Sequence, residues 1–342
     1  MSERVDDVPH TVRVRVPAKL NLALCVGPLA DDGYHPLTTI FQAVSLHDEL
    51  IAQPAAPGEI SVAMSGEGTD SVAVDDSNLA VRAARLLADS YGDERFGVRL
   101  TVKKSIPVAG GMAGGSADAA AALLACSVLW DLDIDPEELR EYGAQLGSDV
   151  PFALMGGTAI GTGRGDKLVP VLSRGSHHWV LAFADTGLST PAVYRHFDQL
   201  QPDGCDLEMP TELINALATG DSEELARHLR NDLAAAAIDL QPSLQATIDA
   251  GLECGALAAI VSGSGPTVAF LCRNEEAAVA LSVALSAEDV ARAVRRVVGP
   301  VAGARLLSGG CPGVRAARRT RRPGVRLAGR SQDSRRQDAG LG

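Results

Sequence analysis

The chain has 342 residues, of which 46% are hydrophobic and 4% aromatic, so it is long enough for two domains with aliphatic cores. Its formal net charge is −12, and because the last 34 residues hold nine arginines and two aspartates, residues 1–308 carry about −19. The negative charge of residues 1–308 argues against nucleic acid as a partner. If the substrate is an anion, this charge also means that local positive groups have to bind it.

The first part of the chain predicts strands followed by one helix. Its elements in chain order are extended segments over 11–26, a turn over 31–36, one or two strands over 37–52, a polar stretch over 53–76, and a helix over 78–91 with Ser77 or Asp76 as its cap. Pro17 interrupts the first alternating segment and is expected at a bulge or an edge, because proline cannot donate a ladder hydrogen bond.

The most informative stretch is PVAGGMAGGSADAA at 107–120, which holds two glycine pairs followed at once by Ser116. A strand is expected before it, over 97–103, and an alanine-rich helix after it, from Ala117 to about Trp130. A glycine loop between a strand and a helix leaves backbone N–H groups open to a ligand, and the helix N-terminus adds partial positive charge. The pattern therefore predicts a site for a phosphate chain.

Shorter elements follow in the second half of the chain. They are a helix over 136–146 capped by Asp135, a strand pair punctuated by glycines at 156–157 and 161–166, a strand over 179–184, a polar loop over 200–212, helices over 211–218, 221–234 and 242–254, a strand–turn–strand unit over 258–272, and helices over 275–285 and 288–297. Because strands and helices interleave without a strict βαβ rhythm, the pattern favours an α+β fold.

Three features outside the loop are candidates for chemistry. Lys19 and Asn21 share one face of a strand whose other face is leucine, so a cation and an amide lie together, either in a site or on an exposed face. Asp149 precedes a Val-Pro-Phe run, where a carboxylate is either a helix cap or a base facing a cleft. SGSGPT at 262–267 is either a plain hairpin turn or a second backbone cradle.

The glycine loop does not match the commoner nucleotide motifs. No lysine in the chain follows a glycine, which excludes a Walker A loop, and GTGRGDK at 161–167 lacks the Gly-Lys-Ser/Thr end of that motif. The G-x-G-x-x-G spacing of a dinucleotide-binding fold is absent from the loop, and the H-R-D and D-F-G signatures of protein kinases are absent from the chain. The loop is therefore expected to belong to a different class of phosphate-binding site.

Taken together, these segments resemble the GHMP kinases, which carry a central P-x-x-x-G-L-G-x-S-S-A loop and a C-terminal glycine motif. Residues 107–117 and 262–266 stand at those two places. Three segments narrow the resemblance to the branch that phosphorylates the 2-hydroxyl of 4-diphosphocytidyl-2-C-methyl-D-erythritol: PAKLNLAL at 17–24, DGYHPLTTIFQAVSLHDEL at 32–50, and LGSDVPFALMGGTAIGTGRGD at 146–166. The resemblance covers about residues 11–308.

The resemblance implies a two-domain α+β fold. An ATP-binding domain similar to the second domain of ribosomal protein S5 would cover 1–165, a ferredoxin-like substrate-side domain would cover 166–308, and a basic, disordered tail would cover 309–342. The reaction would be phosphoryl transfer from ATP with Mg²⁺. Asp149 would act as the base on the substrate hydroxyl, and Lys19 would orient that hydroxyl and offset developing charge.

The resemblance also assigns the binding residues. The ATP site would comprise Pro107, Val108, Ala109, Gly110, Gly111, Met112, Ala113, Gly114, Gly115, Ser116, Ala117, Asn78 and Lys104, with Mg²⁺ near Ser116. The substrate site would comprise Asn21, Tyr34 and His35. The second glycine motif would comprise Ser262, Gly263, Ser264 and Gly265. Tyr34 would stack on the cytosine and His35 would hydrogen-bond its edge. Met112 stands where leucine is usual, and Ala117 and Asp118 stand where serine and asparagine are often found.

The sequence also predicts the surroundings in which the protein works. Its charged start, MSERVDDVPH, lacks the apolar centre of a secretory signal, and no apolar run reaches about 18 residues. Six scattered cysteines without a C-x-x-C pair are typical of reduced thiols. We expect a cytoplasmic monomer or weak homodimer with a small-molecule cytidine diphosphate substrate and no nucleic-acid or membrane partner. Two alternatives stay open: another GHMP kinase, acting on homoserine, mevalonate or a sugar, and a non-catalytic nucleotide-binding protein on the same fold.

Overall fold

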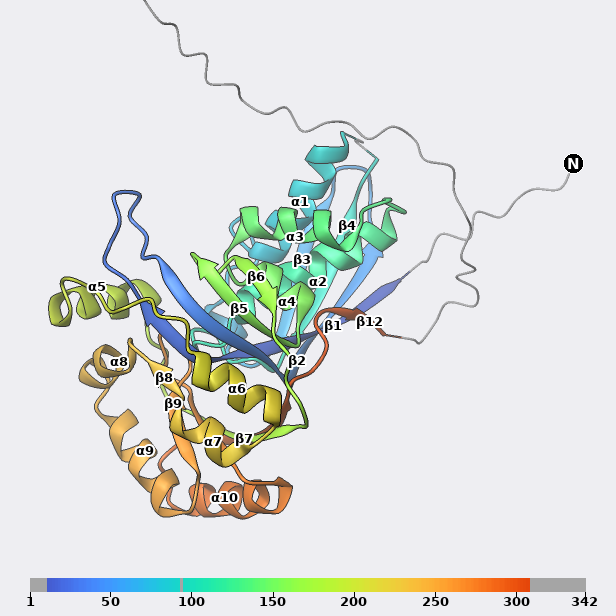
Figure 1. Cartoon of the computed structure of the whole chain (residues 1–342). Helices are drawn as coiled ribbons and strands as arrows, with labels where there is room; N and C mark the ends of the chain where they lie inside the picture. Colours follow the sequence, from blue (N-terminus) through green and yellow to red (C-terminus); the bar gives the residue numbers. More distant parts are fainter. Residues whose placement is uncertain (1–10, 93–94, 308–342) are drawn as a thin grey trace, which may run out of the picture. The chain divides into compact units, whose positions relative to one another are not determined.

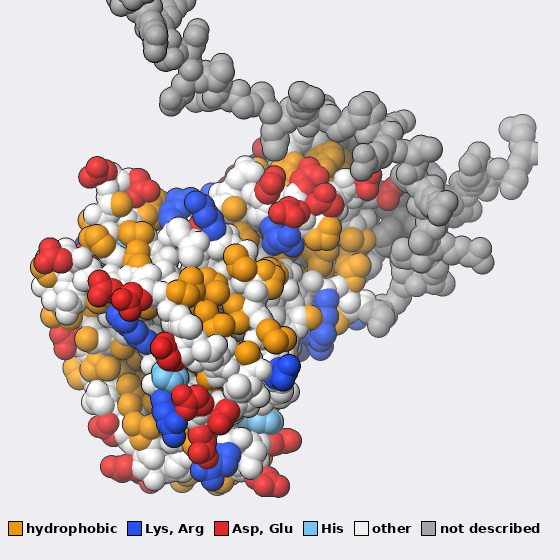
Figure 2. Space-filling view, in the orientation of Figure 1, with side chains coloured by type: hydrophobic (Ala, Val, Ile, Leu, Met, Phe, Trp, Pro, Cys, Tyr) orange, Lys and Arg blue, Asp and Glu red, His pale blue; other side chains and the backbone are white. Residues whose placement is uncertain are grey.

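A computed structural model describes residues 11–92 and 95–307, which belong to one compact unit (Figure 1). The tail predicted over 309–342 lies outside the described residues, and the domain division predicted at residue 165 stays a prediction. In the part of the chain that is described, no helix has the length and apolar character that crossing a bilayer requires. On the face seen in Figure 2, lysine and arginine side chains form small groups among acidic ones.

The first sheet has the strand order β12-β1-β2-β4-β3, with β5 on β2, β6 on β5 and β8 on β1. Its strands are β1 (Val12–Val26), β2 (Leu37–Pro54), β3 (Ile60–Gly66), β4 (Val98–Lys104), β5 (Thr158–Gly163), β6 (Lys167–Pro170), β8 (Arg230–Asn231) and β12 (Arg305–Leu306). The helical segments of this part of the chain are η1 (Thr69–Ser71), α1 (Leu79–Tyr91), α2 (Gly114–Leu129), α3 (Pro136–Leu146) and α4 (Val150–Met155).

The long strand β1 pairs with β2 in antiparallel fashion over its whole length. The register shifts between Pro17 and Ala18, and again between Asn21 and Ala23. The prediction that Pro17 marks a bulge or an edge is therefore confirmed for the bulge, although the predicted segments form one strand, Val12–Val26. The two irregularities enclose Lys19 and Asn21, so the backbone that carries these side chains departs from a regular ladder.

The alanine-rich helix α2 is buried on most of its surface and packs against α1, β1 and β2. Four consecutive alanines, 119–122, have no exposed surface, which lets neighbouring backbones approach closely. The helix begins at Gly114, three residues before the predicted start at Ala117. Tight packing on several sides fixes the position of its N-terminus, which is where the glycine loop ends.

The second sheet has the strand order β11-β7-β10-β9. Its strands are β7 (His177–Phe183), β9 (Ala258–Val261), β10 (Val268–Cys272) and β11 (Ala293–Gly299). The helices of this part are α5 (Thr190–Leu200), α6 (Thr211–Thr219), α7 (Ser222–Arg227), α8 (Ala234–Leu240), α9 (Ser243–Glu253) and α10 (Glu275–Ala287), with α9 and α10 drawn in orange at the bottom of Figure 1. The mixture of largely antiparallel sheets and helices confirms the α+β prediction.

The first strand takes part in both hydrophobic cores. Leu20 and Leu22 pack in the core of the first sheet, whereas Leu24 and Val26 pack in the core of the second. Trp179 on β7 donates its indole N–H to Gln42 Oε1 on β2 at 3.1 Å, which further ties the two sheets together. Side chains in the middle of β1 therefore lie where the two cores meet.

Several expectations about local structure are wrong. The stretch 53–76 contains β3, the segment 221–234 divides into α7, β8 and the start of α8, the segment 288–297 forms most of β11 instead of a helix, and α4 and α5 were not predicted. Asn78, rather than Ser77 or Asp76, caps α1 by accepting a hydrogen bond from the Ala80 N–H at 2.9 Å. The strands β3, β8 and β11, and also the unpredicted β12, pair with strands remote in sequence, and such pairing overrides local propensity.

Candidate active site

A cavity of about 1000 Å³ opens between the glycine loop, β1, the turn after β1, and α5. The cavity lining contains most of the sequence-predicted site residues: Lys19, Asn21, Tyr34, His35, Lys104, Pro107, Val108, Ala109, Gly110, Gly111, Ala113, Gly114, Gly115, Ser116, Asp149, Gly263 and Ser264. The predicted residues outside this lining are Asn78, Met112, Ala117, Ser262 and Gly265. Segments far apart in sequence thus meet around one space.

The residues outside the lining have structural contacts of their own. The Asn78 side chain caps α1 through its oxygen and donates its amide to the Ala73 carbonyl at 2.7 Å, so both ends of the amide are engaged. Met112 is buried, and its carbonyl accepts the backbone N–H of Lys19 at 3.4 Å. The predicted ATP contacts of these two residues stay predictions.

The glycine loop and the second glycine motif contact each other directly. The Ser262 hydroxyl donates to the Gly111 carbonyl at 3.1 Å, and a Cβ atom on Gly111 would collide with the Ser262 carbonyl oxygen. Gly111 also has a φ of 73°, a conformation that glycine adopts without strain. SGSGPT is therefore the turn between β9 and β10 and, through Gly263 and Ser264, part of the cavity wall.

Two alanines in the loop have left-handed backbone conformations, Ala109 with φ 51° and Ala113 with φ 60°. A left-handed conformation costs a residue with a Cβ atom roughly 1–2 kcal/mol, and such strain often accumulates at ligand-binding sites. Ala113 is also the residue from which α2 begins. The start of the helix is thus held in a strained conformation by its surroundings.

We expect Ala113→Gly to raise the free energy of unfolding by up to about 1 kcal/mol, because relief of the left-handed strain exceeds the added entropy of the unfolded chain. Urea unfolding measures the change. Ala119→Gly is the matched control, since Ala119 is buried within the regular part of α2, and it should lower stability by about 1 kcal/mol or more. Equal losses in both variants would contradict the assignment of strain to Ala113.

Lys19 is held by a chain of hydrogen bonds along β1. Its Nζ donates to Asn21 Oδ1 at 2.5 Å, Asn21 Nδ2 donates to Thr39 Oγ1 at 2.9 Å, and Thr39 Oγ1 donates to the Ala23 carbonyl at 2.7 Å. The ammonium also lies 5.6 Å from the centre of the Phe41 ring. Burial lowers the pKa of Lys19, and the negative charge of Asp149 partly opposes that shift. The prediction that Lys19 and Asn21 act as a pair agrees with this geometry.

Asp149 immediately precedes α4, in which Pro151 occupies the first turn. Asp149 stands at the N-cap position of α4, as the helix-cap alternative predicted, but its carboxylate makes no capping hydrogen bond and lines the cavity instead. Its charge acts on Lys19 and also on Tyr194 of α5, where burial and then Asp149 raise the pKa of the phenol. The three side chains therefore share one electrostatic environment. Tyr194 was missed from the sequence, because nothing in its local pattern distinguishes it from a packing residue.

Tyr34 and His35 lie in the turn after β1, opposite α5. Tyr34 is 54% exposed, and the Arg164 guanidinium lies 4.7 Å from its ring centre. His35 is buried, with Nδ1 at 2.8 Å from the Gly27 carbonyl and Nε2 at 3.3 Å from Asp198 Oδ1. Tyr34 therefore has a ring face able to stack, whereas a ring nitrogen of His35 can reach a base only by exchanging one of these partners.

Lys104 lies beneath the glycine loop in a buried cluster of charges. Its ammonium donates to Asp48 Oδ2 at 2.5 Å, Asp118 Oδ2 at 2.8 Å and the Gly114 carbonyl at 3.1 Å. Asp48 Oδ1 accepts the backbone N–H groups of Ser105 and Ile106. The cluster thus connects β2, β4 and the first turn of α2. The predicted nucleotide contact of Lys104 stays a prediction, and its ammonium already has three partners inside the protein.

Asp118 is the less satisfied carboxylate of this cluster. Its Oδ1 is buried without a hydrogen-bond partner, and burial raises the pKa of Asp118 to about 7, with Lys104 opposing the shift. A carboxyl whose pKa is higher in the folded than in the unfolded state contributes stability at low pH and loses that contribution as the pH rises through the folded value.

We therefore expect wild-type stability to fall relative to that of Asp118→Asn between about pH 4 and pH 7, because asparagine resembles the protonated acid and does not titrate. Urea unfolding of both proteins across this range measures the difference, in which the contributions of groups remote from the Lys104 cluster cancel. A difference that stays constant or grows in favour of the wild type would contradict a raised pKa.

Ser116 is the residue predicted to lie near Mg²⁺. It lies in the first turn of α2 and lines the cavity, within the loop predicted to hold phosphates. Among the described residues, no cluster of three or more His, Cys, Asp or Glu side chains could hold a metal by itself. Such a site fits Mg²⁺ that is carried mainly by substrate phosphates and water, since this ion keeps several waters and needs few protein ligands.

Comparisons with known proteins agree with this geometry. The family model described as GHMP kinases N terminal domain matches residues 78–157, and the model described as GHMP kinases C terminal matches residues 213–291. The chain is 53% identical over 308 residues to 4-diphosphocytidyl-2-C-methyl-D-erythritol kinase of Rhodococcus jostii (strain RHA1), covering 90% of this chain and 98% of that protein. The enzyme of that name from Nocardia farcinica (strain IFM 10152) is 54% identical over 302 residues, covering 88% and 97%.

Solved structures of kinases match this chain as well. A 4-(cytidine 5'-diphospho)-2C-methyl-D-erythritol kinase matches with a TM-score of 0.68 and 31% identity, over 84% of this chain and 99% of that chain. An L. major mevalonate kinase in complex with R-mevalonate matches with a TM-score of 0.69 and 19% identity, over 89% and 100%, and this likeness concerns the fold alone.

Proposed function

This chain belongs to the GHMP kinases, and we propose that it transfers the γ-phosphoryl group of ATP to the 2-hydroxyl of 4-diphosphocytidyl-2-C-methyl-D-erythritol. One observation carries the proposal: a glycine loop suited to phosphates, a carboxylate and a buried ammonium face the same cavity. The relatives that are more than half identical to it over nearly their whole length have the name of this kinase.

The acceptor side of the reaction is assigned to Asp149 and Lys19. Asp149 accepts the proton of the substrate hydroxyl as its oxygen attacks the γ-phosphorus and ADP leaves. Lys19 donates a hydrogen bond to the same oxygen and offsets the charge that develops during transfer. The hydrogen bond from Lys19 to Asn21, and the bonds from Asn21 onward to Thr39 and Ala23, hold the ammonium in place before substrate arrives.

The donor side is assigned to the glycine loop. Its backbone N–H groups and the N-terminus of α2 stabilise the phosphates, and the buried Lys104 cluster holds the loop carbonyl of Gly114. Mg²⁺, when bound with ATP, neutralises phosphate charge, and the Ser116 hydroxyl would contribute a ligand to it. A dense, aliphatic core behind the loop keeps these groups fixed during the reaction.

The acceptor substrate is assigned from the part of the cavity that contains Tyr34 and His35. Tyr34 offers an exposed ring, and His35 can offer a ring nitrogen on exchanging its partner Asp198 or Gly27, which suits an aromatic base with hydrogen-bonding edges. Homoserine, mevalonate and simple sugars have no such base. These two residues therefore support the cytidine substrate over the other GHMP kinase substrates.

An assay of ADP release tests the proposal with a panel of acceptors. Turnover is expected with Mg·ATP and the diphosphocytidyl substrate, and none with homoserine, mevalonate or galactose. Turnover of one of the other acceptors would replace the assigned substrate by that one. Measurable ATP binding without ADP release from any acceptor would indicate a non-catalytic nucleotide-binding protein.

A further inference from the structure

Four lysine and arginine side chains line the cavity, and the two lysines already have partners in the protein. Lys104 is paired with Asp48 and Asp118, and Lys19 lies in the field of Asp149. Among the described residues, the guanidinium groups of the other two, Arg164 and Arg195, have no hydrogen bond or ion pair. Two positive charges thus face the cavity of a protein whose first 308 residues carry about −19.

Arg164 stands on the tight turn between β5 and β6. Its backbone N–H donates to Asp166 Oδ1 at 3.2 Å, and the flanking Gly163 and Gly165 have φ values of 71° and 91°, so the turn has a defined shape. Its guanidinium lies over the Tyr34 ring, 4.7 Å from the centre. A guanidinium stacked in this way keeps its in-plane N–H groups available to an anion.

Arg195 stands on α5, which forms the opposite wall of the cavity. Val193 and Phe197 are buried and anchor the helix in the second core, while the neighbouring Tyr194 has its ring centre 5.1 Å from that of His35. Asp198, one turn further along, contacts His35 at 3.3 Å. The helix that presents Arg195 is therefore held against the turn that contains Tyr34 and His35.

We propose that Arg164 and Arg195 bind the diphosphate that links the nucleoside and alcohol ends of the acceptor substrate. This inference rests on the proposed function, in which Tyr34 and His35 receive the base and Asp149 receives the alcohol. A diphosphate joining those two ends has to cross the cavity between them, and its two negative charges match the two unneutralised guanidinium groups. Guanidinium groups bind phosphate oxygens in a bidentate geometry, which favours them over lysine for this task.

The proposal predicts a loss of acceptor affinity without a loss of chemistry. Arg164→Gln and Arg195→Gln should each raise the KM for the diphosphocytidyl substrate by about tenfold, which corresponds to one charged hydrogen bond. The KM for ATP and the value of kcat should stay close to those of the wild type. Both side chains are exposed, so their replacement leaves the core intact. Arg195→Lys should recover part of the affinity, since it restores the charge without the bidentate geometry.

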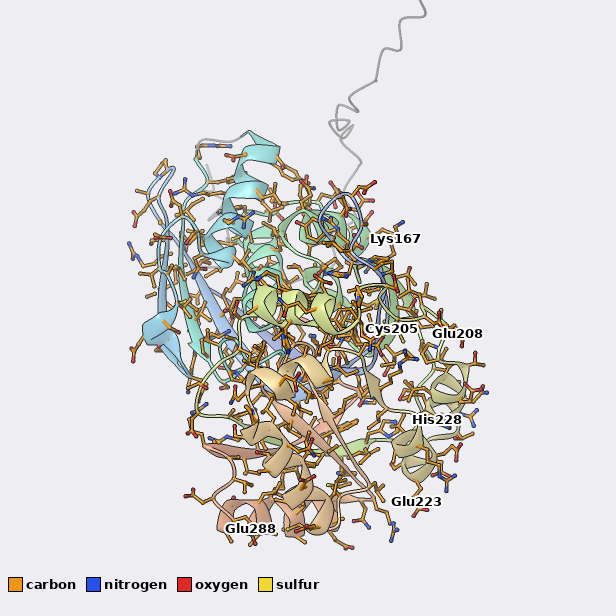
Figure 3. The ribbon with its side chains drawn as sticks, turned by 90° about the vertical axis from the view of Figure 1, so that its left-hand side faces the viewer. Lys167, Cys205, Glu208, Glu223, His228 and Glu288 are labelled. Atoms are coloured by element: carbon orange, nitrogen blue, oxygen red, sulfur yellow. The ribbon has the colours of Figure 1, made fainter. Side chains whose placement is uncertain are left out.

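A control on the same hairpin separates specific binding from loss of charge. Lys167 begins β6, three residues after Arg164, and its side chain is exposed and outside the cavity lining (Figure 3). Lys167→Gln removes one positive charge from the same hairpin and should leave every kinetic constant unchanged. An equal rise in KM in this variant would mean that the effect comes from net charge alone and would overturn the proposal.

Calorimetric binding of cytidine, CMP and CDP tests the inference without turnover. The wild type should bind CDP more tightly than cytidine, and each glutamine variant should lose that preference while its affinity for cytidine stays the same. If Arg164→Gln weakens cytidine and CDP equally, the arginine serves only to hold Tyr34, and the proposal fails for Arg164. If both variants keep the wild-type preference for CDP, it fails for both residues. This experiment decides the inference even where the wild type proves unable to phosphorylate the proposed acceptor, which is the separate failure of the proposed function.

Discussion

Asp149→Asn should lower kcat by about 10²–10⁴-fold, the usual contribution of a general base. The substitution keeps the shape of the side chain and removes its ability to accept the proton of the acceptor hydroxyl. The Kd for ATP should remain at the wild-type value, because Asp149 makes no hydrogen bond to the described residues of the glycine loop or of α2. Steady-state turnover and calorimetric ATP binding, measured on the same preparation, check both halves of this expectation.

Glu141→Gln is the matched control for this variant. Glu141 is exposed on α3, the helix that precedes Asp149, and it is outside the cavity lining. The substitution therefore removes a negative charge from the same region without changing a residue of the site. Its kcat should equal that of the wild type. Turnover of Asp149→Asn within a factor of about three of the control would remove Asp149 from the role of base, since that loss is far below the usual range.

Lys104→Met should lower the free energy of unfolding by about 3–5 kcal/mol, the cost of leaving buried charge without its partner. In the wild type one ammonium lies between Asp48 and Asp118, and both carboxylates are almost completely buried. Methionine fills a similar volume but leaves the two carboxylates facing each other. Urea unfolding with a fluorescence readout, supported by the melting temperature, measures the loss.

Lys103→Met provides a close control for the buried cluster. Lys103 precedes Lys104 on β4, and its side chain is exposed on the other face of the strand. The change of residue type is the same, but no buried carboxylate loses its partner, so stability should change by less than about 0.5 kcal/mol. Similar losses in the two variants would show that the ammonium of Lys104 does not neutralise the buried cluster.

The parts of the site that the sequence predicted are those whose chemistry is local. The glycine loop is one continuous run, Asp135 caps α3 by accepting the N–H groups of Glu137 and Glu138, and the alternation around Lys19 and Asn21 describes one strand face. Each of these features is determined by residues within a few positions of one another. The resemblance to the GHMP kinases then assigned Asp149 and the second glycine motif to the same site as the glycine loop. No local pattern in the sequence predicts that these segments lie together.

The parts that were missed depend on contacts between distant segments. Lys104 and Asp48 are 56 residues apart, and no spacing rule indicates that they share a buried site. The family resemblance assigned a nucleotide contact to Lys104, which stays a prediction, and in the structure its ammonium contacts Asp48, Asp118 and the Gly114 carbonyl. Tyr194 and Arg195 belong to α5, a helix that was not predicted, and they reach the cavity only because Val193 and Phe197 anchor that helix in the second core. Such placements follow from packing, which a pattern along one chain does not contain.

The pairing of β1 has a consequence for how the protein is made on the ribosome. Val14 and Arg15 near the start of the described chain pair with Leu306 and Arg305 near its end, and Leu24 pairs with Asn231. On one edge β1 pairs with β2, which follows it directly in the chain, but its partners on the other edge, β8 and β12, emerge from the exit tunnel long after β1 itself. Contacts between such distant segments slow folding, and an unpaired strand edge is exposed to other chains meanwhile. A nascent chain stalled before residue 230 should thus be held as a partly assembled, aggregation-prone intermediate in which one edge of β1 is still unpaired.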